Sequence, residues 1–500
     1  MLDTVATGPE QSVETQHFDV VIVGAGIAGV GSAYHMKTQS PGRTFTVLEA
    51  QAGFGGTWLT HRYPGVRSDS DLHTFGYRFK PWRGVPIATG PEILAYMQEV
   101  IEENDLDQHI QFSTKVCTAS WSSEDQLWTL ETENAETGRR SRITTGFLWM
   151  CQGYYRHTEP HMPTWLGMAD FAGPIVHPQH WPQDLDYAGK RIVVIGSGAT
   201  AATLIPALAK DAAHVTMLQR SPTYFSAGRN RDDLAETLRE LDIDEAWTHE
   251  IVRRKKLRDG ALFTRVALEQ PAAVRQELLS GVRQHLGDDF DVERHFAPSY
   301  DPWRQRVAVI PDGDMFTAIR EGRAGVVTDH IERFERDGIR LKSGDLLPAD
   351  IIITATGFDL NVLGDISFSI DSEPLDLAQT VTYRGMMFTG VPNLVWVFGY
   401  FRASWTLRAD LIGDFVPRLL DHMKDTGAHS VRPRLRDEDK DMVLGPWVDP
   451  DNFNPGYLAR GMHLMPKSGA KREWQHTQDY WSEKDDFPAI DLSDAAFAYE

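Results

Sequence analysis

The sequence predicts an α/β protein with two dinucleotide-binding domains of the Rossmann type, a small antiparallel β meander and a helical insertion. Three observations lead to this fold class. An apolar strand runs into a glycine-rich turn and then a helix twice in the chain, near residues 20 and 195. Polar and apolar residues alternate around turn signals over residues 110–148, as in antiparallel strands. Residues from about 225 to 300 are highly charged, follow a helical pattern and contain no such turn, which indicates an insertion.

Length and charge narrow the class of protein further. A chain of 500 residues is long enough for two or three domains, and its net charge of −21 disfavours nucleic acids and anionic membranes as partners. No apolar run reaches the roughly 20 residues that span a bilayer. Residues 1–16 lack the pattern of a secretory signal, so we expect a disordered tail on a cytoplasmic protein. Cys117 and Cys151, the only cysteines, are far apart, so a CxxC redox pair is excluded and we expect no metal.

The first glycine-rich turn carries a complete dinucleotide fingerprint. In FDVVIVGAGIAGVGSAYHMK, Gly24, Gly26 and Gly29 follow an apolar strand directly and open a helix. The first glycine permits a tight turn, the second lets the backbone approach a pyrophosphate, and the third lets the helix pack on the strand. The helix N-terminus then faces the phosphates with its partial positive charge. Glu49 ends the second strand, TFTVLEA, where a carboxylate suits a ribose diol.

The second turn repeats the fingerprint with a different ending. KRIVVIGSGATAATLIPALAK contains Gly196, Gly198 and Ala201, and alanine is tolerated at the third position. After the matching second strand, HVTMLQRSP, the chain has Arg220 and Ser221 in place of an acid. A carboxylate would repel a 2′-phosphate, whereas an arginine and a hydroxyl can bind one. The second site is therefore predicted to take NADP rather than NAD.

The two different turns predict two different cofactors, FAD in the first site and NADPH in the second, with the nicotinamide donating hydride to the flavin. The reduced flavin needs an acceptor. A disulfide reductase would pass the electrons to a cysteine pair, which this chain lacks. Molecular oxygen is the remaining acceptor.

Further segments complete the predicted organisation. The apolar strands in FLWMCQGYY and LPADIIITATGFD end at Gly153 and Gly357, and we expect both to return the chain to a dinucleotide-binding sheet. A helix is predicted over residues 408–423, kinked by Pro417, before a tail that wraps the body. The predicted division is a FAD-binding domain from residues 17–155 and 343–500, a linker over 156–189, and an NADPH-binding domain over 190–342.

Two loops carry a resemblance to a known family. FAGPIVHPQHWP resembles the FxGxxxHxxxWP signature of type I Baeyer–Villiger monooxygenases, and GGTWLTHRYPGVRSD resembles that family's GGxWxxxxYPGxxxD signature. Stretches such as MLQRSPTY, PADIIITATG and SWTLRADL are similar to the branch with the ethionamide-activating monooxygenases of mycobacteria, over residues 17–470. The matching positions are Phe171, Gly173, His177, Trp181 and Pro182 in the first loop and Gly55, Gly56, Trp58, Tyr63, Pro64, Gly65 and Asp69 in the second.

The resemblance implies an NADPH-dependent flavin enzyme that inserts one atom of O₂ beside a ketone carbonyl, giving an ester or lactone, and that also oxidises sulfides. It implies an arginine beside the flavin, because an anionic oxygen nucleophile in a dry pocket needs a fixed positive charge. The matching position in PSYDPWRQRVAVIPDGD is Arg306, with Arg304 as the competing assignment. Asp69 is the implied partner of Arg306, and Trp58 and Tyr63 lie near the flavin, order their loop, or belong to the core.

Other positions of the signatures have expected roles of their own. His177 is interpreted as part of a linker that couples nicotinamide binding to the flavin site, rather than as an acid or base. His177 and His180 lie three residues apart without a cysteine nearby, so a metal site is not expected. Many relatives have a lysine before the catalytic arginine that helps to hold the 2′-phosphate, whereas this chain has Gln305. Arg220 and Ser221 would then supply the discrimination.

Three alternatives stay open at this stage. The first is a flavin monooxygenase that oxidises only sulfur or nitrogen, although Trp181-Pro182 favours the Baeyer–Villiger type. The second is a flavin reductase or oxidase that releases peroxide, which would need neither Arg306 nor the His177 loop. The third is a nucleotide sensor that binds FAD without consuming NADPH. The aromatic content of GYFRASW and SWTLRAD, over residues 399–410, suggests an apolar ketone or sulfide as substrate.

Overall fold

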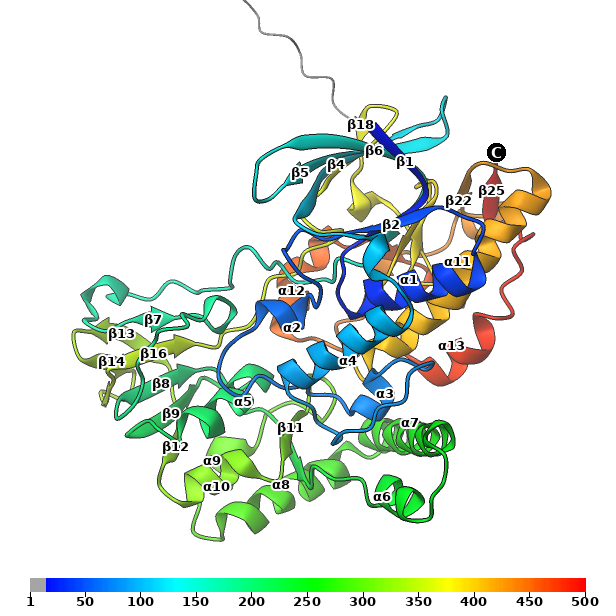
Figure 1. Ribbon diagram of the computed structural model, residues 1–500. Coiled ribbons are helices and arrows are strands. Elements are labelled where there is room, and N and C mark those ends of the chain that lie inside the picture. Colours follow the sequence, from blue (N-terminus) through cyan, green and yellow to red (C-terminus); the bar gives the residue numbers. More distant parts are fainter. Residues whose placement is uncertain (1–14) are drawn as a thin grey trace, which may run out of the picture.

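The structure is a computed structural model that describes residues 15–500. Two α/β bodies lie side by side, and the chain passes between them more than once (Figure 1). The larger body is built on a nine-stranded sheet and the smaller on a five-stranded sheet. Two dinucleotide-binding domains, a β meander and a helical insertion are present, which confirms the predicted fold class.

The centre of the larger sheet is β1 (Thr15–Val23), which pairs in parallel with β2 (Phe45–Leu48) on one side and β6 (Arg140–Met150) on the other. Its last four residues are buried because sheet and helices cover them from both faces. Since β1 begins at Thr15, the prediction of a tail over residues 1–16 was wrong for its last two residues. The rest of that predicted tail, residues 1–14, lies outside the described part of the chain.

The predicted meander extends this sheet. β4 (Thr114–Ser122) and β5 (Leu127–Asn134) run antiparallel and lead into the first half of β6. The second half of β6 pairs with β21 (Leu394–Trp396), and β17 (Ser367–Ile370) and β18 (Glu373–Pro374) lie at the edge beyond β4. β3 (Ile110–Gln111) forms the other edge, beside β2. The C-terminal third of the chain therefore completes the sheet that the N-terminus begins.

Helices cover the larger sheet. α1 (Ile27–Gln39) packs against α11 (Trp405–Thr426), and α4 (Gly90–Glu103) lies beside them, opened by a capping box between Thr89 and Glu92. α11 is longer than the predicted 408–423 and contains Pro417. The end of the chain packs on this body, because β25 (Phe497–Tyr499) pairs with β22 (Val431–Pro433) and Phe497 is buried in the core.

The smaller sheet is parallel throughout, in the order β12 (Ala324–Thr328), β9 (His214–Gln219), β8 (Arg191–Ile195), β16 (Ile351–Thr354) and β7 (Ile175–Val176). The strands that make up this sheet correct two of the predicted domain boundaries. β16 belongs here, so the predicted division between residues 342 and 343 was wrong. β7 lies inside the predicted linker 156–189, and Pro178–His180 forms a 3₁₀ turn, so the signature loop is not wholly irregular.

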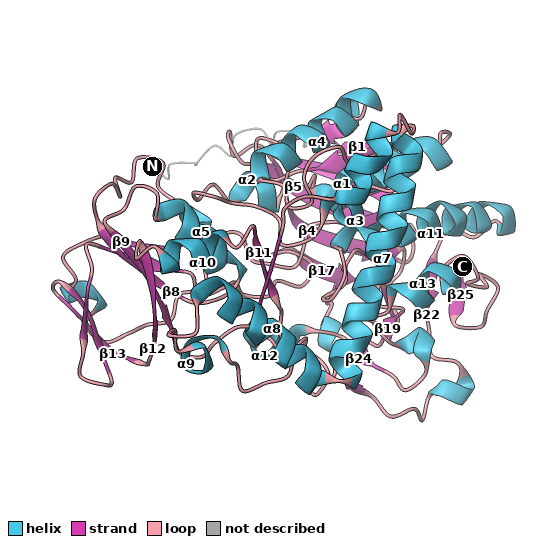
Figure 2. Cartoon of the chain, turned by 90° about the horizontal axis from the view of Figure 1, so that it is seen from below, coloured by secondary structure: helices cyan, strands magenta, loops and turns pink. Residues whose placement is uncertain are grey.

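The helical insertion consists of α6 (Asp233–Glu240), α7 (Glu245–Glu269), α8 (Pro271–Leu286) and α9 (Val292–Phe296). It begins later than residue 225, because β10 (Phe225–Gly228) pairs with β11 (Ala308–Pro311). α7 crosses to the larger body (Figure 2). The buried Arg253 of α7 donates hydrogen bonds to the carbonyls of His73, Thr74 and Gly76, at 3.0, 3.1 and 2.9 Å.

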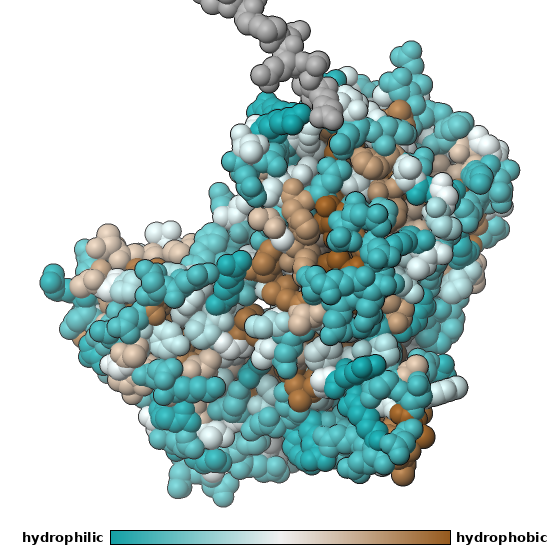
Figure 3. Space-filling model, in the orientation of Figure 1, coloured by the Kyte–Doolittle hydropathy of each residue, from teal (hydrophilic) through white to brown (hydrophobic). Residues whose placement is uncertain are grey.

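One group of apolar side chains is exposed on the helical insertion. Exposed apolar side chains at Leu241, Ile243, Trp247 and Ile251 gather at the turn between α6 and α7, and Figure 3 shows an apolar patch over this end of α7. Among residues 15–500, no helix combines the length and apolar character needed to cross a membrane. The remaining elements are α2 (Thr57–Thr60), α3 (Leu72–Phe75), α5 (Ala199–Leu208), α10 (Asp314–Arg320), β13 (Ile331–Glu335), β14 (Gly338–Leu341), β15 (Leu346–Pro348), β19 (Thr382–Tyr383), β20 (Met387–Phe388), β23 (Gly445–Pro446), α12 (Gly456–Gly461), β24 (Lys467–Ser468) and α13 (Tyr480–Asp486).

Candidate active site

The first glycine-rich turn joins β1 to α1 and needs its glycines for steric reasons. Gly24 has φ of +100°, and a Cβ there would lie 2.8 Å from the carbonyl oxygen of Cys151. A Cβ on Gly29 would lie 1.8 Å from the carbonyl oxygen of Gly24, so only glycine lets α1 pack this close to the turn. Gly26 has a more open backbone, which faces the backbone of Gly56.

The acid at the end of the second strand is held against this turn. Glu49 is buried and accepts hydrogen bonds from the N–H of Ala25 at 2.7 Å and of Gln51 at 2.8 Å. Burial raises the pKa of its carboxyl, and the backbone donors oppose that shift. A carboxylate can accept about four hydrogen bonds, so Glu49 can still accept one from a ribose hydroxyl.

The loop of the GGxWxxxxYPGxxxD signature connects the two bodies. Gly56 has φ of +54°, and Trp58 packs edge-on against Phe75 with ring centroids 5.9 Å apart. Tyr63, by contrast, is buried in the core of the smaller body, and burial raises the pKa of its hydroxyl, which hydrogen-bonds Thr200, to about 12. The loop therefore joins the first turn to α5 of the second body.

The second glycine-rich turn lies between β8 and α5. Gly196 has φ of +128°, and a Cβ there would meet the carbonyl oxygen of Ala355 at 2.3 Å. Gly198 is exposed with open space around it, and Ala201 is fully buried in the core. This arrangement leaves backbone at the N-terminus of α5 accessible to a phosphate group.

Arg220 and Ser221 follow β9 directly, and both are exposed. Within residues 15–500, Arg220 forms no ion pair with an acidic side chain, so its guanidinium is free to bind an anion. The Ser197 hydroxyl donates to the carbonyl of Ser221 at 3.3 Å and pairs with Thr223 at 2.9 Å, which holds this end of β9 next to the glycine turn.

The FxGxxxHxxxWP loop lies on the smaller body beside β16. Phe171 is buried in its core, and a Cβ on Gly173 would meet the carbonyl oxygen of Asp350 at 2.2 Å, so this glycine allows the loop to pack on the sheet. Trp181 packs against the same body, and the exposed Pro182 ends the signature. The side chain of His177 accepts from the N–H of Gln179 at 3.2 Å.

His157 and His177 lie close to His61 beside this loop. Burial lowers the pKa of His177 to about 4, and the nearby backbone of Gly357 opposes this shift. Burial also lowers the pKa of His61 to about 4, and the nearby His157 and His177 lower it further. Both imidazoles are therefore neutral at neutral pH. The role of His177 in a linker that couples the two sites stays a prediction.

Several buried polar atoms near the first turn and these histidines have no hydrogen-bond partner among the described residues. Gln152 follows Cys151 beside the first turn, and its Oε1 is buried and unpaired. His61 Nδ1, His177 Nε2 and Gln179 Oε1 are unpaired in the same way. Buried polar atoms are costly without partners, so these atoms fit a polar ligand that lies against them. Together with the glycine cradles they fit a flavin and a nicotinamide dinucleotide.

The predicted arginine and aspartate meet across the two bodies. Arg306 Nε lies 2.6 Å from Asp69 Oδ2, with 38% of the arginine and 32% of the aspartate side chain exposed. Burial by itself would lower the pKa of Arg306, but Asp69 and nearby tyrosine hydroxyls outweigh it and hold the pKa above its ordinary value. The geometry favours Arg306 over Arg304, because Arg306 forms the pair with Asp69.

Three tyrosines beside this pair were not found by sequence analysis. The Tyr154 hydroxyl donates to that of Tyr155 at 2.6 Å, and the ring of Tyr457 lies 5.6 Å from that of Tyr155. Each of the three has its pKa raised by burial, with the positive charge of Arg306 acting in the opposite direction. Tyr154 and Tyr155 directly follow Gly153, at the end of an apolar strand, which is the signal that could have indicated them. Tyr457 gives no such signal, because it comes from α12.

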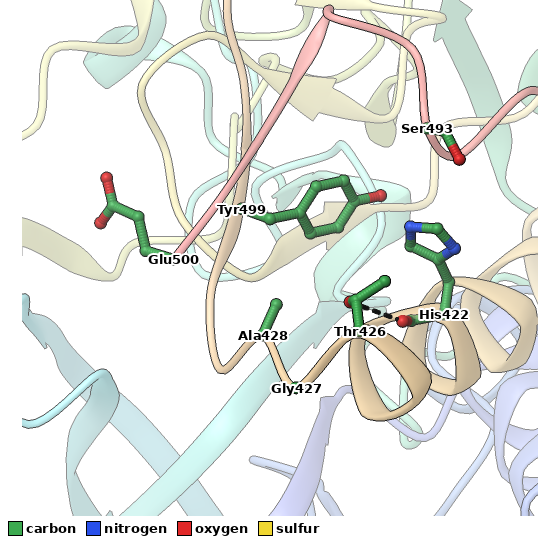
Figure 4. A pocket seen from close by; sticks show the side chains of 7 residues that line it. All are labelled: His422, Thr426, Gly427, Ala428, Ser493, Tyr499 and Glu500. Atoms are coloured by element: carbon green, nitrogen blue, oxygen red, sulfur yellow. Dashed lines mark hydrogen bonds between the residues drawn. The ribbon is translucent and has the colours of Figure 1, made fainter.

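A separate pocket lies at the C-terminal end of α11, between this helix and the last residues of the chain (Figure 4). The ring of Tyr499 lies 5.1 Å from that of His422, and the Thr426 hydroxyl donates to the His422 carbonyl at 2.8 Å. None of the predicted site residues lines it. The pocket is lined by His422, Thr426, Gly427, Ala428, Ser493, Tyr499 and Glu500.

The fold and the two glycine-rich turns define a class of protein, a two-dinucleotide flavoprotein. Comparison with known proteins supports it. A family described as NAD(P)-binding Rossmann-like domain matches residues 22–83, and one described as flavin-binding monooxygenase-like matches residues 88–233. Among solved structures, oxidized steroid monooxygenase bound to NADP has a TM-score of 0.77 at 23% identity, over 97% of this chain and 99% of that chain. OTEMO in complex with FAD and NADP has a TM-score of 0.76 at 22% identity, over 97% of this chain and 100% of that chain.

Sequence relatives identify the family. The chain is 46% identical to the FAD-containing monooxygenase EthA of Mycobacterium tuberculosis over 472 residues, covering 93% of this chain and 94% of the relative. It is 45% identical to EthA of Mycolicibacterium smegmatis over 469 residues, with coverage of 93% and 94%. It therefore belongs to the FAD-containing monooxygenases that include EthA, which confirms the resemblance drawn from the two signature loops.

Proposed function

We propose that this protein is an NADPH-dependent Baeyer–Villiger monooxygenase that also oxidises sulfides. The overall reaction converts a ketone, O₂, NADPH and a proton into an ester or lactone, NADP⁺ and water. The observation that carries the proposal is the ion pair between Arg306 and Asp69, which joins a residue of the signature loop to a residue that follows the helical insertion. A permanent charge at that place stabilises an anionic oxygen nucleophile, which ketone attack requires and which a flavin reductase does not need.

The residues fit FAD in the first site and NADPH in the second. Gly24, Gly26 and Gly29 would hold the pyrophosphate of FAD, and Glu49 its ribose. When bound, the flavin supplies the chemistry that accepts hydride and activates O₂. We propose that the two cofactor sites are shaped in part by Gly56, Trp58, Tyr63 and Gly357, since the loops that carry these residues lie near the two glycine-rich turns.

The second site would hold the coenzyme through other groups. The N-terminus of α5, with Gly196, Gly198 and Ala201, is proposed to bind the pyrophosphate. Arg220 and Ser221 are proposed to bind the 2′-phosphate, because both are exposed at the end of β9. Gln305 carries no charge and therefore leaves this discrimination to Arg220. The neutral His177 is proposed to contact the nicotinamide side of the cofactor sites through its unpaired Nε2.

A second candidate is a monooxygenase of the same fold that oxidises only sulfur or nitrogen. The hydroxyls of Tyr154, Tyr155 and Tyr457 favour it, because proton donors beside the transferred oxygen assist transfer to a heteroatom rather than attack on a carbonyl. The two candidates share cofactors and differ in product.

Product analysis with ¹⁸O₂ tests the proposal. Purified protein with FAD and NADPH is given an apolar linear ketone, an aryl ketone and an aryl sulfide. We expect an ester that carries one labelled atom, together with labelled sulfoxide. Labelled sulfoxide without any ester would support the second candidate instead. Consumption of NADPH with only peroxide formed from this panel would contradict both.

A further inference from the structure

Arg402 joins three segments beside the Arg306–Asp69 pair. It lies in the connection between β21 and α11 and is half-buried. Its Nε and Nη2 donate to the carbonyl of Trp303 at 3.1 and 2.9 Å. Nη2 also donates to the carbonyl and Oδ1 of Asn452, at 2.6 and 3.0 Å. The guanidinium carbon lies 5.3 Å from the ring centroid of Phe453, so stacking restricts it further.

The segment that Arg402 holds is strained. Trp303, three residues before Arg306, has φ of +65°, and a bulky residue in the left-handed region costs on the order of 1–3 kcal/mol. Such a conformation persists only where its surroundings enforce it. A second bond supports the same turn, because the carbonyl of Arg304 accepts from the N–H of Asn454 at 3.0 Å.

The hydrogen bonds of Arg402, called the clamp below, link groups from the two bodies. Trp303 packs toward the insertion, with its ring centroid 6.4 Å from that of Phe263 in α7. Arg402 precedes α11 of the larger body, and Asp69 lies in the signature loop between α2 and α3. The placement of Arg306 against Asp69 therefore depends on contacts that cross the boundary, and Arg402 makes several of them with one side chain.

We propose that Arg402 is a positioning residue that fixes the Trp303 turn to the 449–454 segment and so holds Arg306 in its pair with Asp69. The proposal rests on the proposed function and adds a residue that touches neither reacting atom nor cofactor. Without the clamp, oxygen activated by reduced flavin would be released as hydrogen peroxide, with NADPH, O₂ and a proton giving NADP⁺ and H₂O₂. Reduction of the flavin by NADPH would continue, since the glycine turns do not depend on Arg402.

The test compares Arg402→Ala with Arg418→Ala in the FAD-loaded enzyme. Arg418 is a matched control, because it also donates to two backbone carbonyls, of Phe487 at 3.0 Å and Ile490 at 3.2 Å, in the C-terminal wrap. With an aryl sulfide, R402A should give on the order of 10- to 100-fold less sulfoxide per NADPH consumed, because a displacement of about 1 Å has an effect of this size. Flavin reduction should stay near wild type. Added guanidinium should restore part of the yield in R402A, and R418A should keep the wild-type yield.

A readout independent of activity separates this proposal from the proposed function. Hydrogen exchange of peptides over residues 299–307 and 449–455 should be faster in R402A and unchanged in R418A. Arg402→Lys keeps a charge but cannot reach all these acceptors, so it should give intermediate exchange even where R402A folds poorly. Unchanged exchange in both Arg402 variants, or an equal loss of yield in R418A, would overturn the proposal. Faster exchange in R402A, together with a wild-type enzyme that makes no oxygenated product, would support the role of Arg402 in holding the Trp303 turn. The same pair of results would reject the proposed function.

Discussion

Replacing Asp69 by Asn removes the charge opposite Arg306 while preserving the shape of the side chain. Arg306 Nε and Asp69 Oδ2 are 2.6 Å apart, and a hydrogen bond between charged groups contributes about 1.5–3 kcal/mol. About a third of each side chain is exposed, 38% and 32%, so water screens the pair and the lower value of about 1.5 kcal/mol applies. Because about 1.4 kcal/mol corresponds to a factor of ten, we expect roughly tenfold slower oxygenation in D69N.

Arg306→Ala should have a larger effect than D69N. The arginine supplies the charge itself, and loss of one group that stabilises an oxyanion typically slows a reaction by about 10²–10³-fold. The assay measures labelled ester and sulfoxide formed per second, with NADPH consumption followed separately. NADPH consumption should fall much less than product formation in both variants, so the ratio of product to coenzyme is the informative number.

The double variant provides the strictest test. If Asp69 acts only by orienting Arg306, then D69N in the Arg306→Ala background should cause no further loss. Two results would refute the reasoning. Wild-type product formation by D69N would show that the pair has no role in the reaction. Losses that multiply in the double variant would show that Asp69 acts independently of Arg306.

Three further predictions address other parts of the molecule. Arg220→Ala should raise the KM for NADPH strongly and leave that for NADH nearly unchanged, and an equal loss with both coenzymes would contradict the assignment. Gly29→Ala should yield protein with little bound flavin by absorbance, because its Cβ would lie 1.8 Å from the Gly24 carbonyl oxygen, whereas Gly42→Ala, with no atom within 4 Å of its Cβ, should bind flavin normally. Because the pKa of His177 is about 4 when folded and 6.5 in its ordinary state, the unfolded chain binds more protons between these values, so stability should fall as pH decreases from about 6.5 to about 4. Urea unfolding of His177→Asn between pH 6.5 and 4 should show a smaller decrease in the free energy of unfolding than the wild-type protein shows. An identical decrease in both proteins would exclude His177 as its source.

The parts of the site that depend on local spacing are visible in the sequence. Gly24, Gly26 and Gly29 occupy one turn, and the steric limits of that turn are imposed by residues a few positions away, so the pattern is visible in a single stretch. The meander was visible for the same reason, since antiparallel neighbours are joined by short turns. The pairing of Arg306 with Asp69 followed from family signatures rather than from any local rule.

Contacts between distant segments could be decided only by the tertiary structure. Tyr457 approaches Tyr154 and Tyr155 because α12 packs on Leu360, which pairs with Tyr155, and no periodicity in either segment encodes that approach. The sequence prediction placed β16 in the FAD-binding domain, whereas it belongs to the second sheet, and the error has a related cause. An apolar parallel strand is buried on both faces, so its composition is the same in either sheet and only long-range pairing selects the neighbour.

The sequence by itself determined the two nucleotide turns, the acid and the arginine that distinguish them, and membership in the monooxygenase family. The tertiary structure decided which side chains surround Arg306, where the domains divide, and how Arg402 fixes the strained turn at Trp303. The physical reason is that turn geometry is a short-range steric property of neighbouring residues. Ion pairs and hydrogen bonds between the two bodies depend on how the whole bodies pack. Residues hundreds of positions apart contribute to that packing.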